Sequence, residues 1–344
     1  ISLITKFIDT YNSSNSRYIK LYFITKSVIA SMYDTINFKL SVDDVPEVDF
    51  LQEVPCYLDD ATIGFHNFNG EQVVTGNVGG LKVSINRYQI KVKDGSLCKW
   101  HLGNNFRTMG RGDTQRAIEQ LSDTLHLPMD KAAITRIDVA QNIIVKHPTM
   151  VYLNHLGVLR YAKRLQEPDG LYYSRNGERL CFYDKNREQR AKGEAIPELY
   201  KGRNVLRYEQ RYTRRLATQL KVNEVRAALL YDEAFYMALI QRWRDTYKGI
   251  NKVNDITLNY QAMTSKQQLY KMGVLSMVER VGGEVEMISQ INEAQKRGDL
   301  TSKQAFDLRK AIKEACKVKE GLTVQSEAIA ELDKKIIEAV RYYR

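Results

Sequence analysis

The segment RLCFYDKNREQ, residues 179–189, places a tyrosine, a lysine and a glutamate within six residues, directly after an apolar run. The apolar residues 180–182 are typical of the end of a buried strand. Tyr183, Lys185 and Glu188 follow, so the strand either ends at the surface or presents a nucleophile with two helping groups. A tyrosine attacks a phosphodiester only when its proton, held with a pKa of about 10, is removed or its phenolate is stabilised. The segment is therefore a candidate site for phosphoryl transfer, although most of the 21 tyrosines must be packing residues.

Two further apolar strands carry charged side chains on one face. In ITRID these are Arg136 and Asp138, and in NVLRYEQRY they are Arg207, Glu209 and Arg211. A carboxylate between arginines on a sheet is often a salt-bridge partner, and this interpretation stays open. Burying several charges nevertheless needs a reason, and carboxylate oxygens are hard ligands that suit Mg²⁺ or Mn²⁺. We therefore predict a divalent-metal site at Asp138 and Glu209.

Together these residues predict a tyrosine-dependent phosphoryl transfer on DNA. The metal would polarise the scissile phosphate, Tyr183 would attack in line, and the 5′ phosphate would stay on the protein as a phosphotyrosine ester. Lys185 would share the face of Tyr183 if the strand continues, and there it would hold the phosphate or stabilise the phenolate. Glu188 would be a third metal ligand or a base.

Basic residues are distributed over the predicted strands and helices rather than gathered in a tail. The net charge of +11 and the pI near 9.3 favour a polyanionic partner. In SLCKWHLGNNF, residues 96–106, a lysine, a glycine and two asparagines could approach phosphate oxygens. A turn with an exposed tryptophan here, and solvated charged faces elsewhere, are the alternatives. The predicted DNA-binding residues are Lys91, Lys93, Lys99, Asn104, Asn105, Arg136, Arg207, Arg211, Arg214 and Arg215.

Several other chemistries lack their motifs. The four cysteines are far apart and form no C-x-x-C pair, so a zinc site is not expected. The same spacing is most simply explained by a protein of the reducing cytoplasm. No G-x-x-x-x-G-K-[ST] occurs, so neither an ATP motor nor a nucleotide cofactor is expected. No run of about 18 apolar residues predicts a membrane span. The first 30 or so residues lack the apolar core of a signal peptide.

The chain is predicted to be rich in strands up to about residue 215 and helical after about residue 222. Strands are expected in residues 132–145 and 203–215, a hairpin in 171–188, and helices in 113–126 and 149–165. The alternation in residues 79–95 slips near Arg87, which predicts a bulge. The C-terminal helices are predicted at residues 223–247, 264–281, 284–297, 302–318 and 326–342, the fourth with a capping box of Thr301 and Gln304.

These patterns divide the chain into three predicted parts. Residues 1–31 would be an N-terminal extension that the fold does not need. Residues 32–250 would be the catalytic domain, and residues 251–344 a helical C-terminal region.

In order and spacing, the motifs resemble the replication-initiation endonucleases of filamentous phages, the gene II/X replication protein family of phages and plasmids. ITRID is similar to the family's Ser/Thr-Arg-Ile-Asp strand, FYDKNRE to its Tyr-x-Lys-x-x-Glu segment, and LRYEQR to its Arg-Phe/Tyr-Glu strand. Upstream, SLCKWHLGNN is similar to a Ser-x-x-Lys-x-x-x-Gly-x-Asn segment. The four motifs span about residues 80–215 in the order that the family has.

The resemblance implies an α+β fold, with an antiparallel-sheet domain like that of rolling-circle nickases before the mainly helical C-terminal region. It implies Tyr183 as the nucleophile, Lys185 as its neighbour, and Asp138 and Glu209, with Glu188 in addition, as metal ligands. It also implies nicking of the plus strand at a replication origin, the start of rolling-circle replication, and rejoining of the displaced strand. Such nickases commonly use a His-hydrophobic-His metal motif, which this chain lacks, so its site would be based on carboxylates.

Two other functions remain alternatives. One is a non-catalytic initiator that binds the origin through the same basic sheet, and the other is a conjugative relaxase, against which the lack of paired histidines counts. For the enzyme, the expected partners are origin DNA that is single-stranded at the nick and a host helicase, because the chain has no motor of its own. The expected location is the cytoplasm of a bacterial host.

Overall fold

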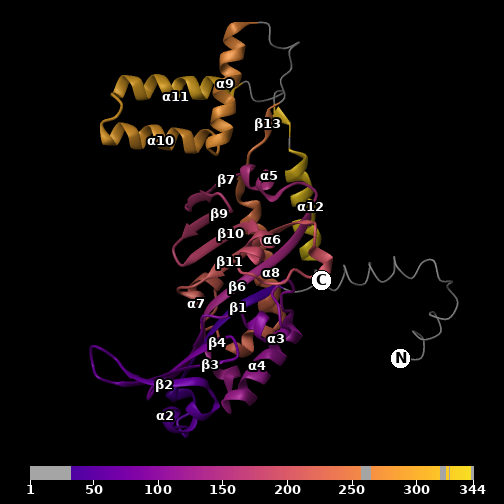
Figure 1. The fold of residues 1–344 in the computed structure, drawn as a ribbon. Helices are drawn as coiled ribbons and strands as arrows, with labels where there is room; N and C mark the ends of the chain where they lie inside the picture. Colours follow the sequence, from indigo (N-terminus) through magenta and orange to yellow (C-terminus); the bar gives the residue numbers. More distant parts are fainter. Residues whose placement is uncertain (1–31, 257–264, 318–322, 325, 342–344) are drawn as a thin grey trace, which may run out of the picture.

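An antiparallel sheet of ten strands forms the centre of the protein, in the order β2-β3-β4-β5-β1-β6-β11-β10-β9-β8 (Figure 1). The computed structural model describes residues 32–256, 265–317, 323–324 and 326–341, so the predicted extension 1–31 lies outside the described residues. The strands are β1 (Tyr33–Ser41), β2 (Asp59–Phe65), β3 (Gln72–Val78), β4 (Leu81–Asn86), β5 (Gln89–Lys93), β6 (Ala133–Val145), β8 (Lys163–Glu167), β9 (Gly170–Arg175), β10 (Glu178–Asp184) and β11 (Asn204–Tyr212). With helices that follow the sheet along the chain, this confirms the predicted α+β class.

Aromatic side chains fix helix α8 (Glu233–Lys248) to one face of the sheet. The ring of Phe182 stacks on Tyr208 with 4.3 Å between centroids, and Tyr208 lies against Trp243 of α8 at 4.6 Å. The Tyr208 hydroxyl also donates to the carbonyl oxygen of Trp243 at 3.0 Å. Because side chains alternate along a strand, the residues next to Phe182 and Tyr208 point to the opposite face. That face carries the polar residues of the motifs.

The predicted helix 149–165 is wrong in its second half. Helix α5 (Thr149–Asn154) is short, and the chain continues as β7 (Leu156–Leu159) and then β8. The Tyr173 hydroxyl donates to the carbonyl of Gly157 at 2.6 Å, and β7 pairs with the distant β12 (Ile250–Lys252). These long-range contacts override the local helical spacing.

The predicted bulge near Arg87 is also wrong, because Arg87 and Tyr88 are a two-residue turn between β4 and β5. Asn86 pairs with Gln89 across the turn, and the Asn86 side-chain oxygen accepts the N–H of both Tyr88 and Gln89 at 3.0 Å. Paired strands run in opposite directions, so the buried positions change from odd to even residue numbers without an extra residue.

The long helix predicted at residues 223–247 starts later, at Glu233. Residues 227–231 form a 3₁₀-helix, and Asp232 then caps α8 by accepting the N–H of Phe235 at 2.8 Å. An N-cap aspartate interrupts a continuous helical spacing, because its backbone is extended while its side chain satisfies the first turn. Helix α4 (Arg111–Leu125) begins close to the predicted position, with Gly110 as its N-cap and Asp113 accepting the Gly110 N–H at 3.2 Å.

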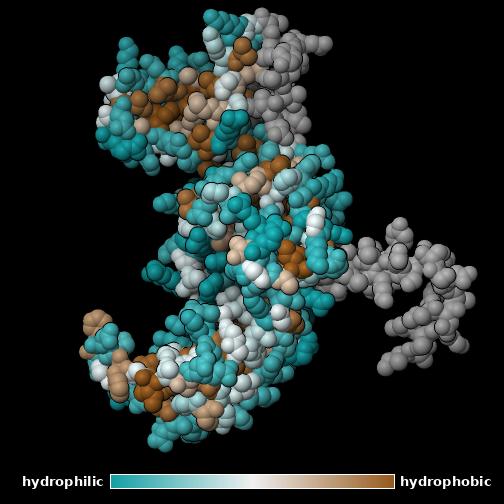
Figure 2. Space-filling model, viewed as in Figure 1, coloured by the Kyte–Doolittle hydropathy of each residue, from teal (hydrophilic) through white to brown (hydrophobic). Residues whose placement is uncertain are grey.

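Three C-terminal helices pack around a small core of their own (Figure 1). They are α9 (Lys266–Val281), α10 (Glu284–Arg297) and α11 (Ser302–Cys316), close to the predicted ranges. Their buried residues are Val278, Ile291, Ala305 and Ile312, and apolar side chains gather between α10 and α11 in Figure 2. The capping box is confirmed, since Thr301 accepts the N–H of Gln304 at 3.3 Å and Gln304 accepts that of Thr301 at 2.9 Å.

The last helix, α12 (Glu327–Arg341), returns to the core of the sheet. Its Asp333 accepts the hydroxyl of Tyr247 from α8 at 2.7 Å, and its Glu331 bonds the hydroxyl of Tyr152 from α5. The short strands β13 (Asp255–Ile256) and β14 (Thr323–Val324) pair between the two cores. The predicted domain boundary near residue 250 remains a prediction. Among the described residues, no helix has the length and apolar character needed to cross a membrane.

Candidate active site

The polar face of the sheet brings the predicted motifs together in three rows of paired residues. Across β9, β10, β11 and β6 the first row is Gly170, Tyr183, Arg207 and Asn142, the second is Tyr172, Cys181, Glu209 and Ala140, and the third is Ser174, Arg179, Arg211 and Asp138. Neighbours in a row are about 5 Å apart. A cavity of about 560 Å³ opens over these rows and is lined by Asp138, Tyr172, Tyr183, Glu209 and Arg211, among others.

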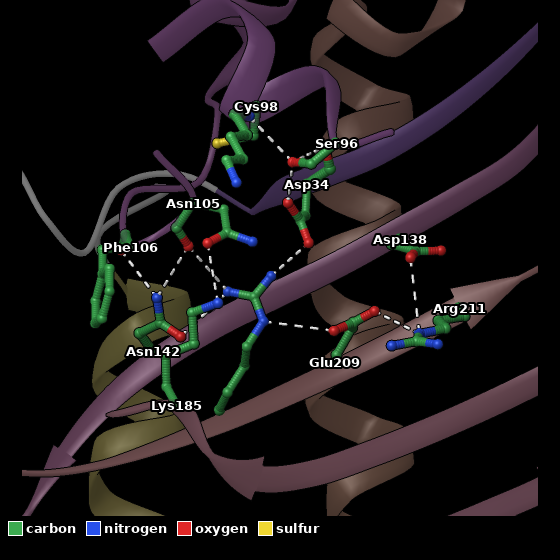
Figure 3. A network of polar contacts seen from close by, with 12 residues as sticks. Asp34, Ser96, Cys98, Asn105, Phe106, Asp138, Asn142, Lys185, Glu209 and Arg211 are labelled. Carbon is green, nitrogen blue, oxygen red and sulfur yellow. Dashed lines mark hydrogen bonds and ion pairs between the residues drawn. The ribbon is translucent and has the colours of Figure 1, made fainter. Parts of the chain in front are cut away.

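Arg207, which is 0% exposed, is the centre of a buried polar network, and its partners Asp34, Asn105, Asn142 and Glu209 are labelled in Figure 3. Its Nη2 donates to Asp34 Oδ2 at 2.6 Å, and its Nε donates to Glu209 Oε2 at 3.4 Å. Its Nη1 donates to Asn142 Oδ1 at 3.1 Å and to the carbonyl oxygen of Asn105 at 3.4 Å. Arg207 was predicted to bind DNA, but its side chain is shielded from solvent and its contacts orient the neighbouring groups.

Asp34 is a site residue that the sequence prediction missed. It binds Arg207, and it also accepts the hydroxyl of Ser96 at 2.6 Å, which connects β1 to the segment 96–106. In a strict alternation Asp34 would share the apolar face with Ile36. A register shift between Tyr33 and Ile36 turns it to the polar face instead. The signal that could have found it is a single carboxylate among the apolar positions of the first strand.

Asp138 and Glu209 form the second part of the network. Arg136 Nε donates to Asp138 Oδ1 at 2.8 Å, and Arg211 Nε lies 3.7 Å from Asp138 Oδ2 and 2.5 Å from Glu209 Oε1. Burial raises the pKa of Asp138 to about 8, against the Arg136 hydrogen bond, and the charge of Glu209 adds to the shift. Burial also disfavours a charged Glu209, but Arg207 and Arg211 outweigh it and lower its pKa to about 2. Both carboxylates therefore have arginine partners, and burial raises the pKa of Asp138 while the arginines lower that of Glu209.

Tyr183 reaches across the sheet from β10 to Glu209. Its hydroxyl donates to Glu209 Oε2 at 3.3 Å, and its ring is partly exposed to the cavity. Burial raises its pKa well above 10, the positive charge of Arg207 opposes this rise, and the negative charge of Glu209 adds to it. The phenol is therefore protonated at rest, with a carboxylate as acceptor for its proton.

Lys185 does not continue the strand of Tyr183, so the expectation that the two share a strand face is wrong. β10 ends at Asp184, which accepts the N–H of Arg187 at 2.9 Å and caps α6 (Lys185–Ala191). The Lys185 ammonium is fully buried and donates to Asn105 Oδ1 at 2.9 Å and Glu188 Oε2 at 2.8 Å. Burial, followed by the charge of Arg207, lowers its pKa.

The asparagines of the segment 96–106 have different roles. Asn105 accepts a hydrogen bond from Lys185 on its side-chain oxygen and one from Arg207 on its carbonyl oxygen. Asn142 Nδ2 donates to the same carbonyl oxygen of Asn105 at 3.3 Å. Asn104 instead closes its own turn by accepting the N–H of Phe106 at 3.1 Å. Lys99, predicted to bind DNA, forms an ion pair with Glu194 (a residue outside the motifs). The segment is therefore a loop held against the sheet rather than an isolated surface turn.

The other predicted DNA-binding residues lie at the surface, and of these Arg136 lines the cavity. Lys91 and Lys93 are exposed on β5, and Arg214 and Arg215 are exposed just after β11. Arg136 is partly exposed beside Asp138. Their roles stay predictions.

The predicted metal ligands are only partly assembled. Among the described residues, no group of three or more His, Cys, Asp and Glu side chains is arranged to hold a metal ion. Glu188 is bound by Lys185 and Lys192 rather than directed at the other two carboxylates. Asp138 and Glu209 remain as two adjacent oxygen donors, and Mg²⁺ accepts one or two carboxylates when a substrate phosphate completes its shell. The residues thus fit a metal that arrives with DNA, and do not fit one bound by protein alone.

The family model that describes the N-terminal part of the gene II-type replication-associated protein of phages matches residues 32–231. The match covers more than half of the 344 residues and all strands of the polar face. The chain belongs to this family. The predicted resemblance to the phage replication initiators is thereby confirmed, and the family supports a role in replication initiation. A comparison with curated proteins found no match to the chain.

Proposed function

We propose that the protein is a site-specific DNA endonuclease that nicks an origin through Tyr183 and starts rolling-circle replication. The covalent product would be a 5′ phosphotyrosine ester, from which the strand is later rejoined. The membership in a family of replication-associated proteins supports the replication role. The chemistry rests on the geometry around Tyr183.

The contact between Tyr183 and Glu209 carries the proposal. A buried phenol loses its proton only when an acceptor and positive charge lie close to it. Glu209, 3.3 Å from the phenol oxygen, is the acceptor. Arg207 and Arg211 both contact Glu209 and supply the positive charge. A negatively charged phosphate entering the cavity would meet Arg211, which lines it, and would weaken the contact of Arg211 with Glu209.

In the proposed step, Tyr183 Oη forms a bond to the scissile phosphorus, and the bond from phosphorus to the 3′ oxygen breaks. The phenolic proton passes by way of Glu209 to solvent, so that Glu209 stays ionised, and the leaving 3′ oxygen takes a proton from solvent. Lys185 acts in this step through Asn105 and Glu188, because its ammonium is buried between them. Its direct contact with the phosphate, expected from the sequence, stays a prediction.

Asp138 and Glu209 would hold Mg²⁺ or Mn²⁺ together with the scissile phosphate, and the metal would polarise that phosphate. The raised pKa of Asp138 supports this part of the proposal, because a cation beside a buried carboxylate favours its charged form as an arginine does. A direct binding measurement tests it: Mn²⁺ should bind wild-type protein with origin DNA more tightly than without DNA. Asp138→Asn should remove that difference.

The DNA would run over the polar face from the cavity towards β4. Asn37 of β1 pairs with Arg136, and farther along the same face Lys39 stands opposite Lys91 and Lys82 opposite Lys93. Like charges directly opposite each other on a sheet are destabilising. Two such lysine pairs on one face are explained by a polyanion that neutralises them.

The remaining parts of the proposal follow from the reaction. The substrate would be origin DNA that is single-stranded at the nick, and a host helicase would unwind the duplex. No nucleotide cofactor is proposed. The site of action would be the cytoplasm of a bacterial host.

The deciding experiment incubates the protein with supercoiled plasmid that carries the native flanking DNA, with Mg²⁺ or with a chelator, and then denatures it. Wild-type protein should yield nicked circles with protein attached, and the chelator should prevent this. Tyr183→Phe should bind the DNA in a mobility-shift assay and form no covalent complex. Tyr161→Phe, an exposed tyrosine in the turn before β8, is the matched control and should act as wild type. Tight origin binding without nicking would overturn the enzyme and favour the non-catalytic initiator.

A further inference from the structure

A second tyrosine faces the same cavity as Tyr183. Tyr172 lies on β9 and lines the cavity together with Tyr183, Asp138 and Glu209. The next residue, Tyr173, points the other way, into the core, where its hydroxyl donates to a backbone carbonyl and is fully buried. Of these two adjacent tyrosines, only Tyr172 is therefore open to a substrate that reaches Tyr183.

The strand register makes Tyr172 and Tyr183 diagonal neighbours. Tyr183 pairs with Gly170, and Tyr172 pairs with Cys181, on adjacent strands. Diagonal neighbours on one face lie about 7–8 Å apart at their backbones, within reach of aromatic side chains. A Cβ placed on Gly170 would lie only 2.9 Å from the Tyr172 hydroxyl. The Tyr172 phenol therefore extends over the glycine that pairs with Tyr183.

The surroundings of Tyr172 suit a group that meets phosphate. The guanidinium carbon of Arg179 lies 4.7 Å from the centroid of its ring. Burial raises the pKa of Tyr172, with Cys181 adding to the rise, while the positive charges of Arg179 and Arg211 oppose it. Arg211 also forms an ion pair with Glu209, the partner of Tyr183. The charge of one arginine therefore acts on the surroundings of both phenols.

The proposed function, on which this inference rests, needs a second acceptor. One tyrosine oxygen carries one phosphate ester at a time. When replication regenerates the origin, the strand must be cut again while Tyr183 still holds the first 5′ end. We infer that Tyr172 is the second nucleophile, which takes the new 5′ end while Tyr183 is occupied.

The step balances as two transesterifications. Tyr172 Oη forms a bond to the phosphorus of the regenerated site, the bond from that phosphorus to the 3′ oxygen breaks, and the phenolic proton reaches the 3′ oxygen through solvent. The freed 3′ hydroxyl then attacks the phosphorus held by Tyr183. The ester bond to Tyr183 Oη breaks and Tyr183 regains a proton. One phosphodiester is lost and one is formed, so no energy source is required.

The test uses two single-stranded oligonucleotides of different length that span the nick site. Each has an upstream arm short enough to dissociate after cleavage, so that adducts accumulate and are not rejoined. The full chain is incubated at high dilution with the first oligonucleotide and then with the second. Intact mass then counts the adducts on each chain. Cleavage by trypsin at Arg175 and Arg179 separates the peptides of Tyr172 and Tyr183, and fragmentation distinguishes Tyr172 from Tyr173.

The measured quantity is the ratio of doubly to singly modified chain, so a general loss of activity does not count as support. Wild-type protein should carry the second adduct on Tyr172. Tyr172→Phe should lower the ratio at least about tenfold. The matched control Tyr161→Phe should leave the ratio as in wild type, because this tyrosine is 82% exposed and outside the cavity.

The opposite results are distinguishable. Single adducts confined to Tyr183, a second adduct on Tyr172→Phe at the wild-type ratio, or a ratio that falls on dilution would each overturn the role of Tyr172 and leave the nickase intact. The first result would mean that a second copy of the chain supplies its own Tyr183, and the last that the second adduct on a chain requires another copy. No adduct on any tyrosine would overturn the proposed function itself, and this inference with it.

Discussion

The two halves of the polar face use charge in opposite ways, although they belong to one sheet. In the half built from β6, β10 and β11, the charged side chains bind one another, and Arg207 and Asp138 are 0% and 1% exposed. In the half built from β1, β4 and β5, Lys82, Lys91 and Lys93 are exposed, and each stands opposite another lysine. One half fixes the direction of each group, and the other creates a positive surface whose lysines are exposed to solvent.

The difference shows how one sheet can hold a buried polar network and an exposed positive surface side by side. Charges that leave water need specific partners, and those partners determine where a reacting group points. Charges that stay in water attract a polyanion over a distance and lose little when they move. Substitutions should therefore have different consequences in the two halves: loss of stability and reactivity in the first, and loss of salt-dependent affinity in the second.

The largest effect is expected for Arg207→Met. Asp34 and Glu209 would stay buried without this partner, and the free energy of unfolding should fall by about 3–5 kcal/mol. Urea unfolding followed by tryptophan fluorescence measures the change. Arg214→Met removes an exposed arginine just after the same strand and should change stability by less than about 0.5 kcal/mol. Equal effects of the two substitutions on the free energy of unfolding would contradict the difference between buried and exposed charges.

A smaller effect, which depends on pH, is expected for Asp138. Its folded pKa of about 8 lies above the unfolded value of about 3.9, so the folded state holds a proton that the unfolded chain has lost. Stability should therefore fall as pH rises through this window, by at most about 1.4 kcal/mol per pH unit. Asp138→Asn should unfold with a flatter dependence, measured from urea midpoints between the two pKa values.

The control for this prediction is Asp123→Asn, an exposed carboxylate of α4. It should keep the wild-type slope of stability against pH. If Asp138→Asn keeps that slope as well, then Asp138 is ionised in the folded protein and the proton assigned to it is absent.

The smallest effect on stability is expected from the double substitution Lys91→Ala and Lys93→Ala. Both side chains are exposed, so unfolding should change by less than about 0.5 kcal/mol. The slope of log affinity for DNA against log salt concentration should nevertheless decrease by about 2, one for each lost phosphate contact. Lys303→Ala with Lys310→Ala, on α11 outside the sheet, should leave the slope unchanged. The opposite pattern would place the DNA on the C-terminal helices.

The strands of the site could be predicted because their pattern is local. Successive side chains of a strand point to opposite faces, so Arg207, Glu209 and Arg211 lie on one face of β11, whichever strands pair with it. The helical ranges of α9, α10 and α11 were close for the same reason, since capping and apolar spacing act within a few residues. Prediction failed where a single residue changes the backbone, as at Asp184, whose cap starts a helix at Lys185.

The amino-acid sequence by itself determined which residues could do chemistry and which of them share a face of their own strand. Only the tertiary structure decided which faces meet. Asp34 and Arg207 are 173 residues apart in the chain and 2.6 Å apart in space, and no local pattern contains that distance. Tyr172 entered the site in the same way, because it was one tyrosine of 21 until the register of β9 and β10 placed it beside Tyr183. Pairing between distant strands is selected by the burial of the whole sheet. For this reason the residues of the site could be predicted from the sequence, whereas their arrangement in space could not.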